Sequence, residues 1–483
     1  MNAYEQLYVV SDLHLGGAPG FQIFDQGATL SALIDLLRQS ESSSLALVLN
    51  GDVVDFLAEP GAVYFDAHGA IDRLKRIMTD SAFSGVFSAL GKFLSTPGRT
   101  LWIVGGNHDV ELSLPNVQTF LTNTLCADEA AKARLRFATA GAGLVCAVGR
   151  AKVLCIHGNE VDSWNMIDYL KLLWVNRALN RQMPLPDWTP NGGTQLVVDV
   201  MNAVKVRFPF VDLLKPEKLD VLFPILLSLD RSVAAKLAKV AAARTRAAAD
   251  AMRHELGFLG AVEPAEVRAG SERDALEQIL QMGRGSQDKV ESGRDPLERA
   301  QDAYARRKPG AMDITNVGDE TLGKTGLLLD FILNRPAEQN LREQLQSALV
   351  DDRTFDARLE DDDFIALDKD IGADIDFLIS GHTHLHRALK RKKGSGYYYN
   401  SGTWISLIKL RSEQLASAEA FKPVYDALRD GTMSALDSHP GMITRRPTVV
   451  SIIAKDGRVN GSLGTVQQNP THIVPIDNTQ FSV

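Results

Sequence analysis

Five short apolar runs in this sequence each end in a polar turn that carries Asp, Asn or His close to glycine. The runs are "LYVV" (7–10), "LALVL" (45–49), "TLWIV" (100–104), "KVLCI" (152–156) and "DFLI" (376–379). Short runs that are apolar throughout predict strands covered on at least one face. Helical patterns separate several of them, such as "ATLSALIDLLRQS" after the first. Strands that alternate with helices predict an α/β fold.

The polar residues that follow these runs are types that hold metal ions. They are Asp12 and His14, Asp52 and Asp55, Asn107, His108 and Asp109, His157, and His382 and His384. Because ligands of open α/β sheets bind beyond the carboxyl ends of the strands, we expect these residues to meet. Imidazole, carboxylate and amide groups without a thiolate favour Mn²⁺, Fe or Zn, and the oxygen ligands also suit Mg²⁺. Since a carboxylate can bridge two ions, the set predicts a pair of divalent metals.

An ordinary loop is the alternative explanation for each turn taken alone, because Gly, Asn and Asp are common turn residues. The five turns together are harder to explain in that way, since they contain five of the ten histidines. Asp-x-His and His-x-His place two side chains on the same side of an extended segment. The neighbouring glycines leave room for backbone to pass close to the site.

The order D-x-H, G-D-x-x-D, G-N-H-D, H-G and G-H-x-H resembles the calcineurin-like metallophosphoesterase superfamily. The resemblance covers residues 8–160 and 376–405, where "NSGTWI" also resembles the family's strand after the last motif. It implies a four-layer αββα sandwich and hydrolysis of phosphate esters by metal-activated hydroxide. It also implies a role for each motif residue. One metal would be held by Asp12, His14, Asp52 and His384, and the other by Asp52, Asn107, His157 and His382.

In this resemblance Asp52 bridges two ions, of which Mn²⁺ is the first expectation and Fe, Zn or Mg²⁺ the alternatives. His108 would face the phosphate and assist the leaving oxygen, and Asp109 would orient His108. Asp55 would lie behind the ligands and steady the loop.

The sequence predicts four segments. Residues 1–162 and 371–460 form the two halves of the phosphoesterase domain, 163–370 a mostly helical insertion, and 461–483 a C-terminal tail. Within the insertion, 164–179 and the Ala-rich stretch 231–256 have helical patterns, and 262–312 is polar and expected to be flexible. Because the insertion separates two ligands of one ion, His157 and His382, it is expected to form a lid over the site.

Several branches of the superfamily compete. The protein Ser/Thr phosphatases carry Arg-Gly after G-D-x-x-D, where this chain has Phe56 and Leu57. The repair nucleases have a short interval between the fourth and fifth motifs, where this chain has its insertion. The UDP-2,3-diacylglucosamine hydrolases are nearest in layout, although they carry Arg in place of His108 and H-G-D in place of "HGNE".

The expected substrate is a phosphomonoester or phosphodiester, with a lipid-linked or nucleotide-sugar-linked phosphate as one option. A metal-dependent nuclease, a cyclic nucleotide phosphodiesterase and a metal-stabilised binding or regulatory protein without turnover stay open. The net charge of −8 and a pI near 5.7 give no global attraction to nucleic acid. The oligomeric state stays open too.

Three scattered cysteines suit a reducing compartment, and the N-terminus has no signal-peptide pattern. The longest apolar run, 221–229, is about half of a membrane span and contains Pro224. A cytoplasmic protein, with peripheral contact to the inner face of the membrane as an option, is therefore expected.

Three further segments of the sequence have both a functional and a structural interpretation. His386, Arg387 and Lys390, in the basic run 386–393, are candidates for binding an anionic substrate, with a solvated face as the alternative. "GDETLGKT" (318–325) matches a P-loop pattern but lacks a preceding strand, so we interpret it as a loop. Trp164 and Trp174 lie on the apolar pattern that opens the insertion, for which core packing is expected and a lipid-facing role is the alternative.

Overall fold

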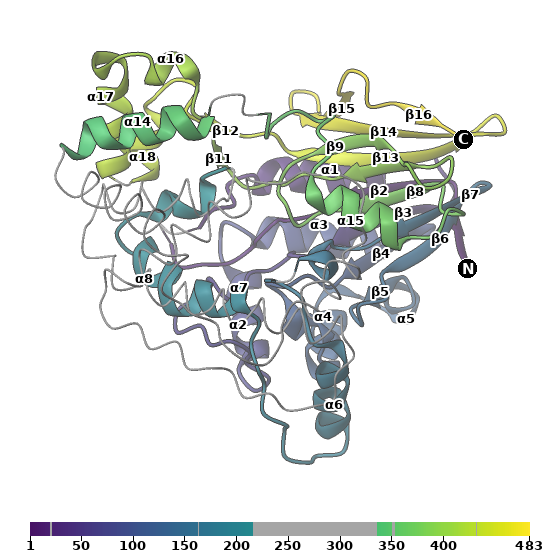
Figure 1. Cartoon of the computed structure of the whole chain (residues 1–483). Helices are drawn as coiled ribbons and strands as arrows, with labels where there is room; N and C mark the ends of the chain where they lie inside the picture. Colours follow the sequence, from purple (N-terminus) through teal and green to yellow (C-terminus); the bar gives the residue numbers. More distant parts are fainter. Residues whose placement is uncertain (20–21, 163, 216–335, 350–352, 431) are drawn as a thin grey trace, which may run out of the picture.

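Two β-sheets packed face to face form the centre of the molecule (Figure 1). The computed structural model describes residues 1–19, 22–162, 164–215, 336–349, 353–430 and 432–483. Between the sheets lies a core of alternate side chains from both, including Leu7 and Val9 from one sheet and Phe377, Ile379 and Tyr399 from the other.

The larger sheet has eight strands in the order β15-β14-β13-β2-β3-β4-β5, with β16 also paired to β14. Its parallel part is β2 (Gln6–Val10), β3 (Leu45–Asn50), β4 (Arg99–Val104) and β5 (Leu135–Ala138). Its antiparallel part is β13 (Thr448–Lys455), β14 (Arg458–Gln467), β15 (His472–Pro475) and β16 (Phe481–Ser482). The residues expected to be a C-terminal tail, 461–483, therefore complete this sheet.

The smaller sheet has six strands in the order β1-β6-β7-β8-β10-β9. They are β1 (Asn2–Tyr4), β6 (Leu144–Val148), β7 (Ala151–Cys155), β8 (Phe377–Ser380), β9 (Arg387–Lys390) and β10 (Tyr397–Asn400). The pairing of β7 with β8 is parallel and joins the two halves of the chain across the insertion.

Helices cover both outer faces. On the larger sheet lie α1 (Gly27–Arg38), α2 (Ala70–Thr79), α3 (Ser84–Ser95), α4 (Pro115–Leu125) and the short α5 (Glu129–Lys132). On the smaller sheet lies α15 (Asp362–Asp370), whose Phe364 and Leu367 pack with Leu378 and Tyr398. This order of helix, sheet, sheet and helix agrees with the predicted α/β sandwich.

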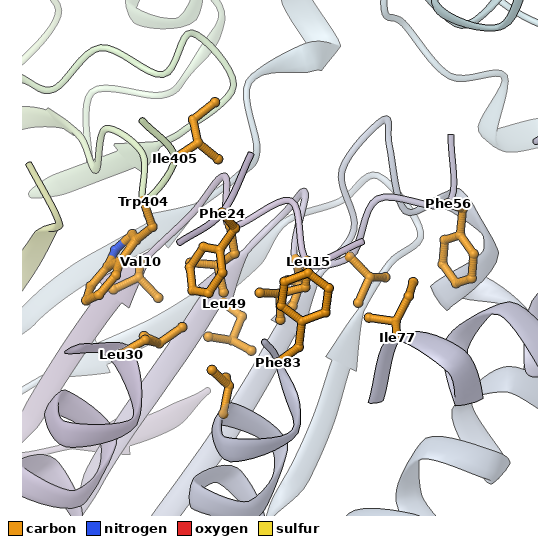
Figure 2. Close-up of a cluster of buried hydrophobic side chains, with 14 of the residues drawn as sticks. Val10, Leu15, Phe24, Leu30, Leu49, Phe56, Ile77, Phe83, Trp404 and Ile405 are labelled. Atoms are coloured by element: carbon orange, nitrogen blue, oxygen red, sulfur yellow. The ribbon is translucent and has the colours of Figure 1, made fainter. Parts of the chain in front are cut away.

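The core under α1 and α3 also joins the halves of the chain. Figure 2 shows Trp404 and Ile405, from the C-terminal half, in one cluster with Val10, Phe24 and Leu30. The Trp404 ring is 1% exposed, and its Nε1 donates to the Thr448 carbonyl at 2.9 Å. The loop after β10 is therefore held against the loop after β2 by apolar packing.

A helical group that the sequence patterns did not indicate lies beyond the short strand pair β11 (Leu407–Ile408) and β12 (Ile443–Thr444). It consists of α16 (Ser412–Leu415), α17 (Ala418–Asp430) and α18 (Met433–Asp437), together with α14 (Ala337–Leu349) from the insertion. Figure 1 shows these helices together at one edge of the molecule. Gln346 Nε2 donates to the Leu415 carbonyl at 2.6 Å, which ties α14 to α16.

The described parts of the insertion contain helices and connecting loops. Besides α14 and α15 they are α6 (Tyr169–Asn180), α7 (Gly192–Leu196), the π-helical turn η3 (Val197–Met201), α8 (Asn202–Lys205) and the 3-10 turn η4 (Pro209–Leu213). The helix expected at 164–179 thus begins at Tyr169. The stretches 231–256, 262–312 and 318–325 lie outside the described residues. In the part that is described, no helix combines the length and the apolar character needed to cross a bilayer.

Candidate metal centre

The five predicted motifs meet in one place, although they come from two sheets. β2, β3 and β4 are parallel neighbours in one sheet, and β7 and β8 are parallel neighbours in the other. Three groups of side chains at these ends have ligand atoms within 4.8 Å of one another. The groups are Asp12, His14 and His384; His14, Asp52 and His108; and Asp52, His157 and His382.

The backbone at these residues is unusual. Nine non-glycine residues of the described chain have a positive φ, and five of them are predicted metal ligands. They are Asp12 (53°), His14 (48°), Asp52 (50°), His382 (71°) and His384 (62°). The Asp-x-His and His-x-His segments are therefore not the extended segments that the alternation argument assumed. Left-handed backbone is costly outside glycine and tends to collect at functional sites, where surrounding contacts impose it.

The loop after β10 supplies those contacts. Thr403 Oγ1 donates to the Asp12 carbonyl at 2.7 Å, and Asn400 Nδ2 donates to the Gly381 carbonyl at 2.6 Å. Ser11 Oγ and Ser401 Oγ lie 2.7 Å apart. The loop "NSGTW" therefore contacts two motifs from different halves of the chain and fixes their positions relative to each other.

Two glycines are required by close approach. Gly51 has a φ of 85°, and a Cβ on it would overlap the ring of His157. A Cβ on Gly106 would overlap the carboxylate of Asp52. The expectation that glycine leaves room at the site is confirmed at both positions.

The first group of ligand atoms surrounds a point between His14 and His384. Their Nε2 atoms lie 3.0 Å apart, His384 Nε2 lies 3.4 Å from Asp12 Oδ1, and His14 Nε2 lies 3.8 Å from Asp52 Oδ2. His14 Nδ1 pairs with Asp55 Oδ2 at 3.1 Å, which leaves Nε2 to face the group. Two imidazoles and two carboxylates, nearly excluded from water, fit a divalent cation.

The group of Asp52, His157 and His382 shares Asp52 with the group of His14, Asp52 and His108. His157 Nδ1 lies 2.9 Å from the Asn50 carbonyl, so its Nε2 points toward Asp52 Oδ2, 3.2 Å away. Asn107 Oδ1 and His157 Nε2 are buried, and neither has a hydrogen-bond partner in the described structure. Buried polar atoms are normally paired. The buried, unpartnered oxygen of Asn107 and the His157 nitrogen that faces Asp52 therefore fit a second cation.

Asp162 and Asn165 support this second group, and the sequence analysis missed both. His382 Nε2 lies 2.9 Å from Asp162 Oδ2, which leaves Nδ1 as the nitrogen available to a metal. Asn165 Nδ2 donates to Asp162 Oδ2 at 2.6 Å, and Asn107 Nδ2 reaches Asn165 Oδ1 at 3.5 Å. Carboxylates commonly orient metal-binding histidines in this way. The only signal in the sequence was that Asp162 closely follows the H-G motif.

The predicted role of Asp109 is corrected by its contacts. Its carboxylate accepts from the backbone N–H groups of Val53 at 2.7 Å and Gly106 at 2.6 Å, and it does not contact the His108 ring. The ring is held by Asp55, whose Oδ1 lies 3.2 Å from His108 Nδ1. Asp109 therefore ties two motif loops together, and Asp55 contacts both His108 and His14.

Charges at the site perturb its pKa values strongly. Burial alone would raise the pKa of Asp52, but the positive charges of His157 and His108 hold it well below its usual value. Burial opposes protonation of His108, yet Asp55 and Asp52 raise its pKa to about 9. Asp52 likewise raises the pKa of His157 to about 10 against the effect of burial. Both imidazoles are thus cationic at neutral pH in the metal-free protein.

This charge state predicts how metal binding depends on pH. His157 keeps its proton until the pH approaches about 10, so a metal ion must displace that proton. The apparent metal affinity should therefore rise with pH, by up to about tenfold per unit for one displaced proton. Calorimetry in buffers of different ionisation enthalpy measures the protons released. His157→Asn should remove most of this dependence, whereas His68→Asn, at an exposed position, should leave it unchanged.

The basic run after the last motif does not gather at the site. Arg387 is 1% exposed, and its Nε donates to Asp361 Oδ2 at 2.8 Å, which makes it a structural ion pair. Lys390 pairs in register with Tyr397 at the start of β10, the end of the sheet away from the motif loops. His386 is buried near Arg446 Nη1, 3.3 Å away, and burial and that charge lower its pKa to about 4.

The insertion instead brings other cations near the motif histidines. The pKa of His384 lies well below its usual value, first because of burial and next because of the nearby charge of Lys215. Lys215 is 7% exposed and directly follows Leu214, which bridges to Ile408. The charge of Lys205 acts on His108 in the same direction, although more weakly than the two carboxylates.

Comparison with known proteins agrees with this geometry. Residues 6–222 match the family described as calcineurin-like phosphoesterase. The matched range contains the motifs from Asp12 to His157, and the structure adds His382 and His384 from outside it. No curated protein matches the sequence. Residues 6–222 are therefore similar to the calcineurin-like phosphoesterase family, and the buried Asp and His clusters indicate a metallophosphoesterase, a hydrolase.

Proposed function

We propose that this protein is a dinuclear metal-dependent phosphoesterase that hydrolyses a phosphomonoester or phosphodiester. The observation that carries the proposal is the shared carboxylate of Asp52, which lies within ligand distance of both His14 and His157. In the proposal Asp12, His14, Asp52 and His384 hold one ion, and Asp52, Asn107, His157 and His382 hold the other. Mn²⁺ is the first candidate because the ligand set mixes imidazole with oxygen donors.

Two divalent ions, when bound, lower the pKa of a water molecule and neutralise charge on the phosphoryl oxygens. The chain's own contribution to bond cleavage comes from His108. Asp55 contacts the His108 ring and its negative charge favours the protonated imidazole, so His108 can give a proton to the oxygen of the leaving group. Asp55 holds the ring through Nδ1, which leaves Nε2 to face the substrate.

The described first part of the insertion supports a lid over this site. Asn202 Nδ2 donates to the Leu57 carbonyl at 2.9 Å, and the Trp188 ring stacks on Phe65 with centroids 4.4 Å apart. Leu57 and Phe65 lie in the loop that begins with Asp52. Farther along, Leu214 bridges to Ile408, beyond the "NSGTW" loop. The insertion thus contacts the loops of both halves of the domain.

The positive charge of Lys215 acts on His384, which favours a substrate with an anionic group beyond the phosphate that is cleaved. A nucleotide-sugar-linked or lipid-linked phosphate has this chemistry. The family match specifies no branch, so the layout shared with UDP-2,3-diacylglucosamine hydrolases remains a guide to the substrate class only. The chain's net charge of −8 does not favour a nucleic-acid substrate.

Turnover of aryl phosphates tests the proposal. The full chain, stripped of metal and reloaded with Mn²⁺, Zn²⁺ or Mg²⁺, should hydrolyse p-nitrophenyl phosphate or bis(p-nitrophenyl) phosphate only in the loaded form. Absence of turnover with every metal, together with tight metal binding, would favour a binding or regulatory protein. Cleavage of single- or double-stranded DNA at a higher rate than either aryl ester would favour a nuclease.

A further inference from the structure

Helix α6 carries an exposed apolar stripe. Leu170 is 59% exposed, Leu173 53% and Trp174 51%, and Met183, just after the helix, is 60% exposed. These are four of the eleven large hydrophobic side chains that are exposed in the described part of the chain. Isolated exposed apolar residues are normal on protein surfaces, but a contiguous patch marks an interaction site. The expectation of core packing is therefore wrong for Leu170, Leu173 and Trp174.

The other face of α6 is well anchored. Leu172 is 3% exposed and Val175 1%, and Asn176 Nδ2 donates to the Ser113 carbonyl at 3.2 Å. Residues 170, 173 and 174 lie three and four positions apart, so they form one stripe opposite this buried face. Figure 1 shows α6 at the edge of the molecule, extending away from both sheets. The stripe is thus presented by a rigid element and not by a loose end.

The charge along the stripe has one sign. Arg177 and Arg181 are exposed and follow Trp174 at helical spacing, so they continue the same face. Between residues 169 and 186 the sequence contains Lys171, Arg177 and Arg181 and no Asp or Glu. A chain with a net charge of −8 therefore places a local excess of positive charge beside the exposed apolar stripe of α6.

We propose that α6 docks this protein on an anionic phospholipid surface. Trp and Leu suit the boundary between headgroups and acyl chains, and Arg suits lipid phosphates at the same depth. The basic charge beside them complements the negative potential of an anionic leaflet. A second copy of the chain is a weaker match, because a stable protein interface needs about 20–30 residues on each side. The stripe offers far fewer.

The proposal extends the proposed function by placing the hydrolase next to lipid-linked phosphates, and it rests on that function only for this consequence. Binding and turnover can be measured separately. The full chain should co-sediment with vesicles that contain phosphatidylglycerol and should bind pure phosphatidylcholine vesicles much less. Added salt should weaken the binding, because screening reduces the attraction of exposed charges.

Variants assign the binding to the stripe. Leu173→Glu together with Trp174→Glu should lower vesicle affinity by about tenfold or more, because they replace inserted apolar groups with charges that an anionic surface repels. Ile365→Glu is the matched control, since Ile365 is 49% exposed on α15. Thermal melting should show that both proteins are folded, and both should hydrolyse a soluble aryl ester like the unmodified protein.

Three outcomes would overturn the proposal. The first is that the unmodified chain leaves phosphatidylglycerol vesicles in the supernatant. The second is that Ile365→Glu weakens binding as much as the double variant. The third is that analytical ultracentrifugation finds a dimer that the double variant dissociates, which would assign the stripe to a second copy. Loss of aryl ester turnover in every protein, with vesicle binding intact, would count against the proposed function alone.

Discussion

Asp52→Asn should abolish hydrolysis and remove most of the bound metal, with a loss in kcat/KM of about 10⁴-fold or more, as for residues that act as one catalytic unit. Asp52 is 1% exposed and is the acid shared by the groups around His14 and His157. Its Oδ1 also accepts the backbone N–H of His108 at 2.8 Å. Asparagine can keep that last contact, but it removes the negative charge that both metals would share.

Elemental analysis measures the metal directly, with two ions per unmodified chain and less than one per variant chain as the expected result. Asp437→Asn is the control, because Asp437 makes an exposed ion pair with Arg445, which also pairs with Asp25. Full metal content in Asp52→Asn, or normal turnover without metal, would contradict the shared carboxylate.

The second prediction concerns His108 and its partner. His108→Asn and Asp55→Asn should each lower kcat by about 10²- to 10⁴-fold on an alkyl phosphate ester, the range for a lost general acid. The loss on an activated aryl ester should be much smaller, since its leaving oxygen needs no proton. The two variants should behave alike because Asp55 orients the His108 ring and its charge, against the effect of burial, raises the pKa of His108.

Asp109→Asn tests whether Asp55, as the contacts indicate, or Asp109, as the sequence predicted, orients His108. Asp109 accepts two backbone N–H groups and is fully buried, so its variant should lower the melting temperature and leave the leaving-group dependence unchanged. Metal content should be followed in Asp55→Asn, because Asp55 also contacts His14. Equal losses on alkyl and aryl esters in His108→Asn would show that His108 only binds the phosphate.

The α/β class and the location of the site follow largely from local patterns in the sequence, whereas the double-sheet arrangement was implied only by the family resemblance. An apolar strand that must be buried stops where Asp, Asn, His or Gly begins, so "LYVV" before Asp12 and "LALVL" before Asp52 mark both a strand and a candidate ligand. All five runs expected to be strands are strands within one residue at each end. The strands and the candidate ligands could be predicted together because both the burial of a strand and the chemistry of a metal ligand depend on residue type and on order along the chain.

The tertiary structure alone decided which residues meet across the site. Asp55 and Asp109 are both aspartates within motifs, and only the approach of the loops after β3 and β4 places Asp55, and not Asp109, against the His108 ring. Thr403 and Lys215 act on ligands from distant segments, so no local spacing could reveal them. Asp162 lies near the H-G motif, but its contact is with His382 in the other half of the chain. The same holds for Leu173 and Trp174, whose apolar pattern fits a core helix. Whether such a face is covered depends on what packs against it, a property of the assembled fold and not of the helix.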